Sequence, residues 1–351
     1  MLIARAPVRI SLAGGGTDLP AYYEQYGGCV ISTSIDKYFY VFLQPSPDAD
    51  LQITSSDYQT FYRQAGQDPT EFFWGGDLEL PRAILHHFGI TRGVSMFLAS
   101  EIPPGTGLGS SSTVSVALVK AITTAKGLKP SPSEIAELAS YIEIQKLGMP
   151  IGKQDQYAAA YGGLNRIDFE QGRVTVTPLN LSAKTRGRIE QHLMLFFTGS
   201  TRSASNILKQ QKAASERQDP RVLDALHAVK AMAVQVQGAL ERGDVEALGD
   251  ILRESWEQKK QFAANVSNAR IDELYQRALA HGARGGKIAG AGGGGFLMLC
   301  CAPEKQEEVT RALEAEGLKR MTFHFENGGA RVLVNAGLRL NGTAAHVDES
   351  S

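Results

Sequence analysis

The sequence predicts an α+β fold in which helices and strands build two packed domains. Its 351 residues exceed what one compact core usually holds. Strand-like runs fill much of the first half and return near the end, whereas 203–281 is strongly helical in pattern. No internal repeat or low-complexity linker separates the halves, so the sequence places the domain boundary only approximately, near 185–191. We expect domains at 1–190 and 191–340, followed by a polar tail at 341–351.

Local patterns place the elements of the first domain. Apolar, aromatic and β-branched runs predict strands at 2–13, 38–44, 51–54, 58–62, 93–99, 163–169 and 173–178. The last two flank Gln171-Gly172, which predicts a hairpin. Helices are expected at 79–88, 110–126 and 133–146, and the second of these is small and apolar throughout, as a helix packed on several sides would be.

The second domain is expected to open with a strand at about 192–198 and to continue with the helical stretch. Further strands are predicted at 286–289, 296–301, 320–325 and 330–334, with one helix at 304–316.

Composition narrows the class of function. With 36 basic and 37 acidic residues, the net charge of −1 offers no general field for nucleic acid or an anionic membrane. Cys29, Cys300 and Cys301 form neither a zinc-type pair nor an even disulfide framework, which favours a reducing compartment. Two arginines interrupt the first apolar stretch and no later run could span a bilayer, so we expect a cytoplasmic protein.

The segment PPGTGLGSSS, residues 103–112, is the strongest functional signal. It joins a predicted strand to a predicted helix, so glycine backbone, free N–H groups and the positive helix end surround a bare loop that can hold phosphate. The lysine of a P-loop is missing, which excludes that class. A plain loop capped by Ser110 or Ser111 is the alternative, but capping explains one serine rather than three serines and three alternate glycines.

Two further glycine-rich segments leave alternatives open. Residues 290–295 contain a G-x-G-x-x-G match, yet they precede a strand pattern rather than a helix, which argues against a dinucleotide site. A turn pressed against a ligand and a turn that only packs tightly are equally good interpretations. In the first segment, residues 9–20, Asp18 comes just after the triple glycine at 14–16 and could either cap a helix or accept hydrogens from sugar hydroxyls.

Together, the three segments resemble those of the GHMP kinases over nearly the whole chain. That family's phosphate loop has the form P-x-x-x-G-L-G-S-S, and its third motif is similar to KIAGAGGG at 287–294. The sequence RAPVRISLAGGGTDL at 5–19 most resembles that of the heptose 7-phosphate kinases of the family. Galactokinase-type members carry an acidic-histidine pair where this chain has Gly15 and Gly16, a departure that argues against galactose.

The resemblance implies a role for each matching residue. Asp155 would accept or orient the proton of the attacking hydroxyl, and Arg9 would be the catalytic cation. Glu143, twelve residues before Asp155, would share Mg²⁺ with Ser111. ATP would lie on Pro104, Gly105, Thr106, Gly107, Leu108, Gly109, Ser110, Ser111 and Ser112. The sugar would meet Gly15, Gly16, Thr17, Asp18, Asp155, Gly292 and Gly293.

It also implies the two-domain GHMP kinase fold, with the active site in the cleft between the domains. The expected activity is ATP- and Mg²⁺-dependent phosphorylation of the anomeric hydroxyl of D-glycero-D-manno-heptose 7-phosphate. The 1,7-bisphosphate would feed nucleotide-activated heptose and surface polysaccharide synthesis. A 1-kinase for fucose or galactose and a non-catalytic sugar and ATP sensor are the alternatives. Small molecules are the expected partners, and a homo-oligomer is compatible with the sequence.

Three other features have simpler interpretations. The aromatic cluster around Trp74 fits a core better than an adenine contact, and His86-His87 fits the end of a surface helix. Arg202 could meet a substrate phosphate, or its neighbours Thr201 and Ser203 could simply cap a helix.

Overall fold

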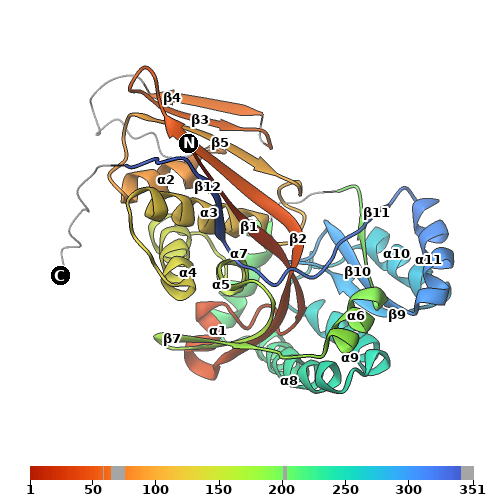
Figure 1. The fold of residues 1–351 in the computed structure, drawn as a ribbon. Helices are drawn as coiled ribbons and strands as arrows, with labels where there is room; N and C mark the ends of the chain where they lie inside the picture. Colours follow the sequence, from red (N-terminus) through yellow and green to blue (C-terminus); the bar gives the residue numbers. More distant parts are fainter. Residues whose placement is uncertain (58, 65–75, 201–203, 341–351) are drawn as a thin grey trace.

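Two β-sheets with helices packed on them make up the molecule (Figure 1). The computed structural model describes residues 1–57, 59–64, 76–200 and 204–340. Within these ranges, one sheet has eight strands and the other has four. The predicted α+β class is therefore confirmed. Trp74 and Arg202 lie outside the described residues.

The larger sheet is organised around two long strands near the N-terminus. β1 (Leu2–Ala13) pairs antiparallel with β2 (Gly28–Pro45) along most of its length. The sheet order is β12-β1-β2-β5-β3-β4, and β6 pairs with β2 and β7. The other strands are β3 (Leu51–Ser55), β4 (Thr60–Gln64), β5 (Val94–Ser100), β6 (Leu164–Glu170), β7 (Arg173–Pro178) and β12 (Arg331–Asn335).

The sequence pattern covered only the second half of β2. Its second half pairs with β5, whereas its first half pairs with β6 about 130 residues further along the chain. Residues 28–33 are buried, but small and polar side chains among them give no clear strand alternation. Pairing distant in sequence therefore forms this part of the strand.

Four helices pack beside the larger sheet. They are α2 (Glu79–His87), α3 (Ser110–Ala125), α4 (Pro132–Ser140) and α5 (Gln154–Tyr161). A short helix, α1 (Pro20–Tyr26), connects β1 to β2. α3 contacts β1, β2, α2, α4 and α5, which confirms the interpretation that its small apolar residues serve packing on several sides.

The continuous helix expected at 133–146 changes its geometry midway. α4 ends at Ser140, and a π-helical turn, Tyr141–Lys146, follows it. A π-helical turn adds a residue to the helical repeat and so rotates the side chains that follow it; such turns are common at functional sites. Glu143 lies in this turn and is completely buried.

The smaller sheet has the order β11-β8-β10-β9 and carries most of the remaining helices. Its strands are β8 (Leu193–Phe197), β9 (Ala283–Ile288), β10 (Phe296–Cys301) and β11 (Lys319–Met321). The helices are α6 (Ala183–His192), α7 (Ala204–Glu216), α8 (Pro220–Arg242), α9 (Val245–Lys259), α10 (Ala269–Ala280) and α11 (Gln306–Glu314).

The last strand crosses the expected domain boundary. β12 falls inside the predicted second domain, yet it pairs antiparallel with β1 of the larger sheet, with Leu2 opposite Asn335. One buried cluster also joins the halves, because Val8, Ile10 and Leu12 of β1 pack with residues of α8, α9 and β10. A cut at residue 190 would expose this shared core, so the domain boundary stays a prediction that must allow for the return of β12.

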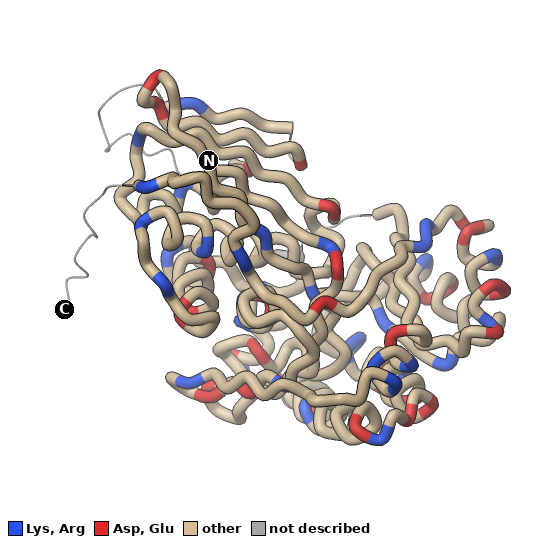
Figure 2. The backbone as a smooth tube through the Cα atoms, in the orientation of Figure 1, with Lys and Arg blue, Asp and Glu red and all other residues tan. Residues whose placement is uncertain are grey.

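Basic and acidic residues are interspersed along the backbone (Figure 2). This distribution agrees with the near-zero net charge and favours local over general recognition of anions. Among the helices of the described ranges, none combines the length and the apolar character needed to cross a membrane.

Candidate active site

A pocket opens where the end of β1, the start of α3 and the start of α5 face helices of the smaller sheet. One wall of the pocket consists mainly of glycines and small polar residues. The other wall consists of residues from α7, α8, α9 and the glycine-rich segment after β9 (residues 290–295), here called the glycine turn. Its lining includes Arg9, Ser11, Gly15, Gly16, Asp18, Gly105, Gly107, Gly109, Ser110, Ser111, Ser112, Gln154, Asp155, Gln211, Ser255, Lys259, Phe262, Lys287, Gly290 and Ala291.

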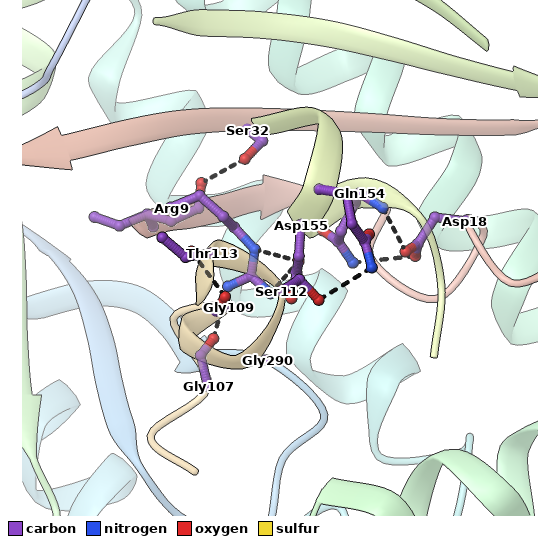
Figure 3. Close-up of polar contacts among 12 residues, drawn as sticks. Arg9, Asp18, Ser32, Gly107, Gly109, Ser112, Thr113, Gln154, Asp155 and Gly290 are labelled. Atoms are coloured by element: carbon purple, nitrogen blue, oxygen red, sulfur yellow. Dashed lines mark hydrogen bonds and ion pairs between the residues drawn. The ribbon is translucent and has the colours of Figure 1, made fainter. Parts of the chain in front are cut away.

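Arg9 joins three parts of this pocket (Figure 3). Its guanidinium donates from Nε to Asp155 Oδ1 at 2.7 Å, and Nη2 lies 2.6 Å from the same oxygen. Nη1 donates to the carbonyl oxygen of Gly107 at 2.7 Å. Arg9 is only 3% exposed, so a displaced Asp155 would leave a nearly buried cation without its counter-charge. The contacts therefore fix Asp155 relative to the loop at 105–109.

The loop at 105–109 alternates between the pocket and the protein interior. Gly105, Gly107 and Gly109 line the pocket and have positive φ angles of 73°, 85° and 80°, which only glycine adopts readily. The side chains of Thr106 and Leu108 are buried. Pro104 comes just before Gly105 in the sequence and does not line the pocket. Of the predicted ATP-binding residues, the structure thus brings the glycines and serines to the pocket and places Pro104, Thr106 and Leu108 behind it.

The helix that follows this loop begins without a side-chain cap. Its N-cap residue is Gly109 in a left-handed conformation, and Ser110 and Ser111 are not capping residues. The first N–H groups of a helix have no partner within it, and the positive end of the helix dipole lies there. Because Ser110, Ser111 and Ser112 all line the pocket, this helix start can receive an anion.

The glycine turn after β9 packs directly on the phosphate loop. A Cβ atom on Gly290 would lie 2.5 Å from Gly107 Cα, and one on Gly107 would overlap the carbonyl of Ala289. The backbone of Phe296 also donates to the carbonyl of Thr106 at 3.1 Å. Backbone-on-backbone packing thus accounts for glycine at these positions, which is the tight-packing interpretation of this segment.

Gly292 and Gly293, which were predicted to contact the sugar, lie in the same turn but contact Val266. The N–H of Gly293 donates to the carbonyl of Val266 at 2.8 Å, and Gly292 lies against the same residue. Gly290 and Ala291 line the pocket in their place.

Asp18 lies on the opposite side of Asp155 from Arg9 (Figure 3). Its Oδ1 accepts from the N–H of Gly16 at 2.9 Å and from Gln154 Nε2 at 3.0 Å, while Oδ2 accepts from the N–H of Gln154. Leu19, not Asp18, is the N-cap of α1, so the capping alternative does not hold. Burial, and then the negative charge of Asp155, raise the pKa of the Asp18 carboxyl.

The neighbours of Asp18 divide between pocket and scaffold. Gly15 and Gly16 line the pocket. Thr17 is fully buried, and its hydroxyl donates to the carbonyl of Gly14 at 2.8 Å and accepts from the N–H of Cys29 at 3.0 Å. Its role in this structure is to hold the turn that presents Asp18.

Glu143 points inward from the π-helical turn to the start of α3. It accepts from Ser112 Oγ at 3.1 Å and from Gln156 Nε2 at 2.7 Å, and burial raises the pKa of its carboxyl to about 7. Ser111, the other predicted metal ligand, is exposed and lines the pocket, whereas Ser112 makes the contact to Glu143. Around the described residues, no group of three or more His, Cys, Asp or Glu side chains could hold a metal ion alone.

This donor set still fits Mg²⁺. Mg²⁺ commonly keeps several waters and takes only one or two carboxylates, with substrate phosphates completing its shell. One buried carboxylate beside serine hydroxyls at a phosphate-accepting helix start has that composition. Glu143 and Ser111 would be the ligands, as the resemblance implies, and the carboxyl would have to be deprotonated.

Several pocket residues were not predicted from the sequence. Gln154 holds both oxygens of Asp18, and Ser11 Oγ and Gln154 Oε1 are buried atoms without a hydrogen-bond partner among the described residues. Lys287 and Lys259 are buried lysines of the far wall. Gln154 and Lys287 belong to the family-like motifs at 152–156 and 287–294. Lys259 follows Leu252 and Ser255 at helical spacing on the buried face of α9, and this spacing is visible in the sequence.

The histidines at the end of α2 lie apart from this site. His86 is exposed, and His87 contacts Lys146 and Tyr141, as suits the end of a surface helix.

The arrangement suits transfer of a charged group to a hydroxyl. Both contacts from Arg9 go to Oδ1 of Asp155, and a Cβ atom on Gly109 would lie 3.0 Å from Oδ2, so Oδ2 faces the phosphate loop. A carboxylate oxygen beside an anion-binding helix start can accept the hydrogen of a hydroxyl that attacks the bound anion.

Known families and proteins are similar to this chain over most of its length. The model of the GHMP kinases N terminal domain matches residues 79–163, and that of the GHMP kinases C terminal region matches residues 236–319. The chain is 34% identical over 335 residues to D-glycero-alpha-D-manno-heptose 7-phosphate kinase of Campylobacter jejuni, with 93% of this chain and 97% of that protein covered.

Two solved structures are similar over nearly their full length. A D-glycero-D-manno-heptose 1-phosphate kinase from Bacteroides thetaiotaomicron has a TM-score of 0.80 and 29% identity, covering 96% of this chain and 100% of the other. A putative sugar kinase from Campylobacter jejuni has a TM-score of 0.75 and 32% identity, covering 94% and 97%.

The contact between glycine turn and phosphate loop can be tested by stability. Gly107→Ala should lower the free energy of unfolding by about 1–3 kcal/mol more than Gly127→Ala, because overlap with Ala289 adds to backbone strain. Gly127 is the matched control, since its φ of +76° resembles the +85° of Gly107 but its Cβ would meet nothing within 4 Å. Chemical denaturation measures both; equal losses would mean that the contact is loose.

Proposed function

The chain belongs to the GHMP kinase family, and from that premise we propose that it transfers the γ-phosphate of ATP, with Mg²⁺, to the anomeric hydroxyl of D-glycero-D-manno-heptose 7-phosphate. The family and the phosphotransferase class predicted from the motifs are confirmed by 34% identity over 93% of the chain to a named kinase. The observation that carries the finer proposal is Asp155, held by Arg9 with one oxygen facing the phosphate loop.

ATP is assigned to the side of the pocket formed by the loop and α3. Its terminal phosphates would meet the free N–H groups of Ser110, Ser111 and Ser112 at the helix start. Bound Mg²⁺ would neutralise phosphate charge and align the transferred group. Burial disfavours the charged form of Glu143 and raises its pKa to about 7, and a cation bound beside it would favour the carboxylate again.

The proposed transfer step is a single displacement. The oxygen of the anomeric hydroxyl forms a bond to the γ-phosphorus while the bond from that phosphorus to the β,γ-bridging oxygen breaks, which releases ADP. The hydroxyl proton passes toward Oδ2 of Asp155, which accepts it or chiefly orients the hydroxyl. Arg9 holds Asp155 in place and adds positive charge where phosphoryl charge spreads.

The sugar is assigned to the side of Asp18. Gly15 and Gly16, where galactokinase-type members carry an acidic-histidine pair, line this part of the pocket. Ser11 Oγ and Gln154 Oε1 have no hydrogen-bond partner among the described residues and could bond sugar hydroxyls. The similarity to heptose 7-phosphate kinase supports a larger, phosphorylated acceptor. Its product would be a 1,7-bisphosphate for nucleotide-activated heptose and surface polysaccharide synthesis.

A coupled assay of ADP release tests the activity and the role of Asp155 together. Heptose 7-phosphate should give turnover exceeding that with fucose, galactose or unphosphorylated heptose. Asp155→Asn should lower kcat by about 10²–10⁴-fold, because it removes the proton acceptor, while the affinity for ATP stays within a few-fold.

Asp168→Asn is the control for that substitution. Asp168 also pairs with an arginine, Arg166, but does not line the pocket, so its loss should leave kcat nearly unchanged. Near-normal turnover of Asp155→Asn would contradict the assignment of Asp155. ATP and sugar binding without turnover of any sugar would instead favour the sensor alternative.

Substitution of Glu143 tests the metal assignment. Glu143→Gln keeps groups able to bond Ser112 and Gln156 but removes the negative charge, so the Mg²⁺ concentration for half-maximal rate should rise about 10-fold or more. Titration of Mg²⁺ at fixed ATP measures it, with thermal unfolding as the check on folding. An unchanged Mg²⁺ dependence in a stable variant would remove Glu143 from the metal site.

A further inference from the structure

Lys259 is a buried cation in the part of the pocket wall that α9 and the glycine turn form. It is the last residue of α9, is 9% exposed, and lines the pocket together with Ser255 and Phe262. Buried lysines are rare unless an acid pairs with them. Across the described residues, no carboxylate lies within ion-pair distance of the Lys259 ammonium, which distinguishes it from Arg9.

The hydrogen bonds of Lys259 attach it to the glycine turn. Its Nζ donates to the carbonyl of Ile288 at 3.0 Å and to the carbonyl of Gly290. An ammonium has three hydrogens, so two carbonyls leave one for another acceptor. Gly290 also packs on Gly107, which places Lys259 next to the loop assigned to phosphate.

The charges around Lys259 are mostly positive. The positive charge of Arg9, on β1, acts on Lys259, and Lys259 acts in turn on Lys287, on β9. Lys287 donates to the carbonyl of Leu12 at 3.0 Å. The pocket acids, Asp18 and Asp155, are already held by Gln154 and Arg9. Burial, and then Arg9, lower the pKa of Lys259 to about 7.

This wall lacks negative charge, and a phosphate would supply it. We propose that the Lys259 ammonium binds a phosphate group of a substrate, with its third hydrogen, at the junction of α9 and the glycine turn. The assignment rests on the proposed kinase function and adds a phosphate contact that the motifs do not contain. The phosphate is either that of the nucleotide or that of the acceptor sugar, and both present the same dianion.

Linked proton uptake gives a test that packing alone cannot imitate. At pH 8 a group with a pKa of about 7 is roughly nine-tenths neutral, whereas a phosphate ester is already a dianion. A dianion beside Lys259 raises the pKa of the lysine, so binding should take up close to one proton. Titration calorimetry in two buffers of different ionisation enthalpy measures this number directly.

Three ligands separate the sources of phosphate. A non-hydrolysable ATP analogue with Mg²⁺, heptose 7-phosphate and unphosphorylated heptose are titrated separately. Uptake with the analogue assigns the site to the nucleotide, uptake with the sugar phosphate assigns it to the acceptor, and unphosphorylated heptose should give none.

Three variants isolate Lys259. Lys259→Met should abolish the uptake and weaken binding of that ligand about 10–100-fold, because the charge is lost. Lys259→Arg should keep part of the affinity without any uptake, because a guanidinium stays protonated. Lys260→Met is the matched control, since Lys260 is the next residue but pairs with Glu257 and is absent from the pocket lining, and it should behave like the unaltered protein.

The failures can be told apart. Turnover in the ADP assay with no proton uptake for either phosphate ligand, or uptake that persists in Lys259→Met, would overturn this proposal alone and leave Lys259 a support of the glycine turn. Failure of both phosphate ligands to bind would overturn it together with the proposed function.

Discussion

The ion pair between Arg9 and Asp155 is the contact on which the site depends. Asp155 lies on a helix 146 residues along the chain from Arg9, and the same guanidinium also holds the carbonyl of Gly107. A buried arginine is costly without an acceptor for its hydrogens, so strand, loop and helix are held together as one unit. This constraint sets the direction of the Asp155 oxygen that faces the phosphate loop.

Close backbone packing completes the site from the other half of the molecule. The turn at 289–292 rests on the phosphate loop only because glycine stands at Gly107 and Gly290. Lys259 bonds the carbonyls of Ile288, just before the turn, and of Gly290. The buried cluster shared by β1, α8 and β10 also supports the contact between this turn and the phosphate loop. The two halves therefore share a buried core beside the pocket.

Local sequence explains part of this structure. β1, α3, the hairpin of β6 and β7 and the loop at 105–109 follow from periodicity, small residues and glycine, because each depends on neighbours in sequence. The return of β12 to β1 and the first half of β2 depend on distant partners, and the π-helical turn on packing of Glu143. The position of the glycines and serines at the pocket was readable from the motif. The burial of Thr17 required the fold.

A crystal structure with a non-hydrolysable ATP analogue, Mg²⁺ and the sugar phosphate tests the central arrangement most directly. We expect the terminal phosphate at the start of α3, between the N–H groups of Ser110–Ser112 and Oδ2 of Asp155, with the acceptor hydroxyl on the Asp155 side of the phosphate. A triphosphate bound away from this helix start, or an Asp155 turned from the phosphate while still paired with Arg9, would contradict it.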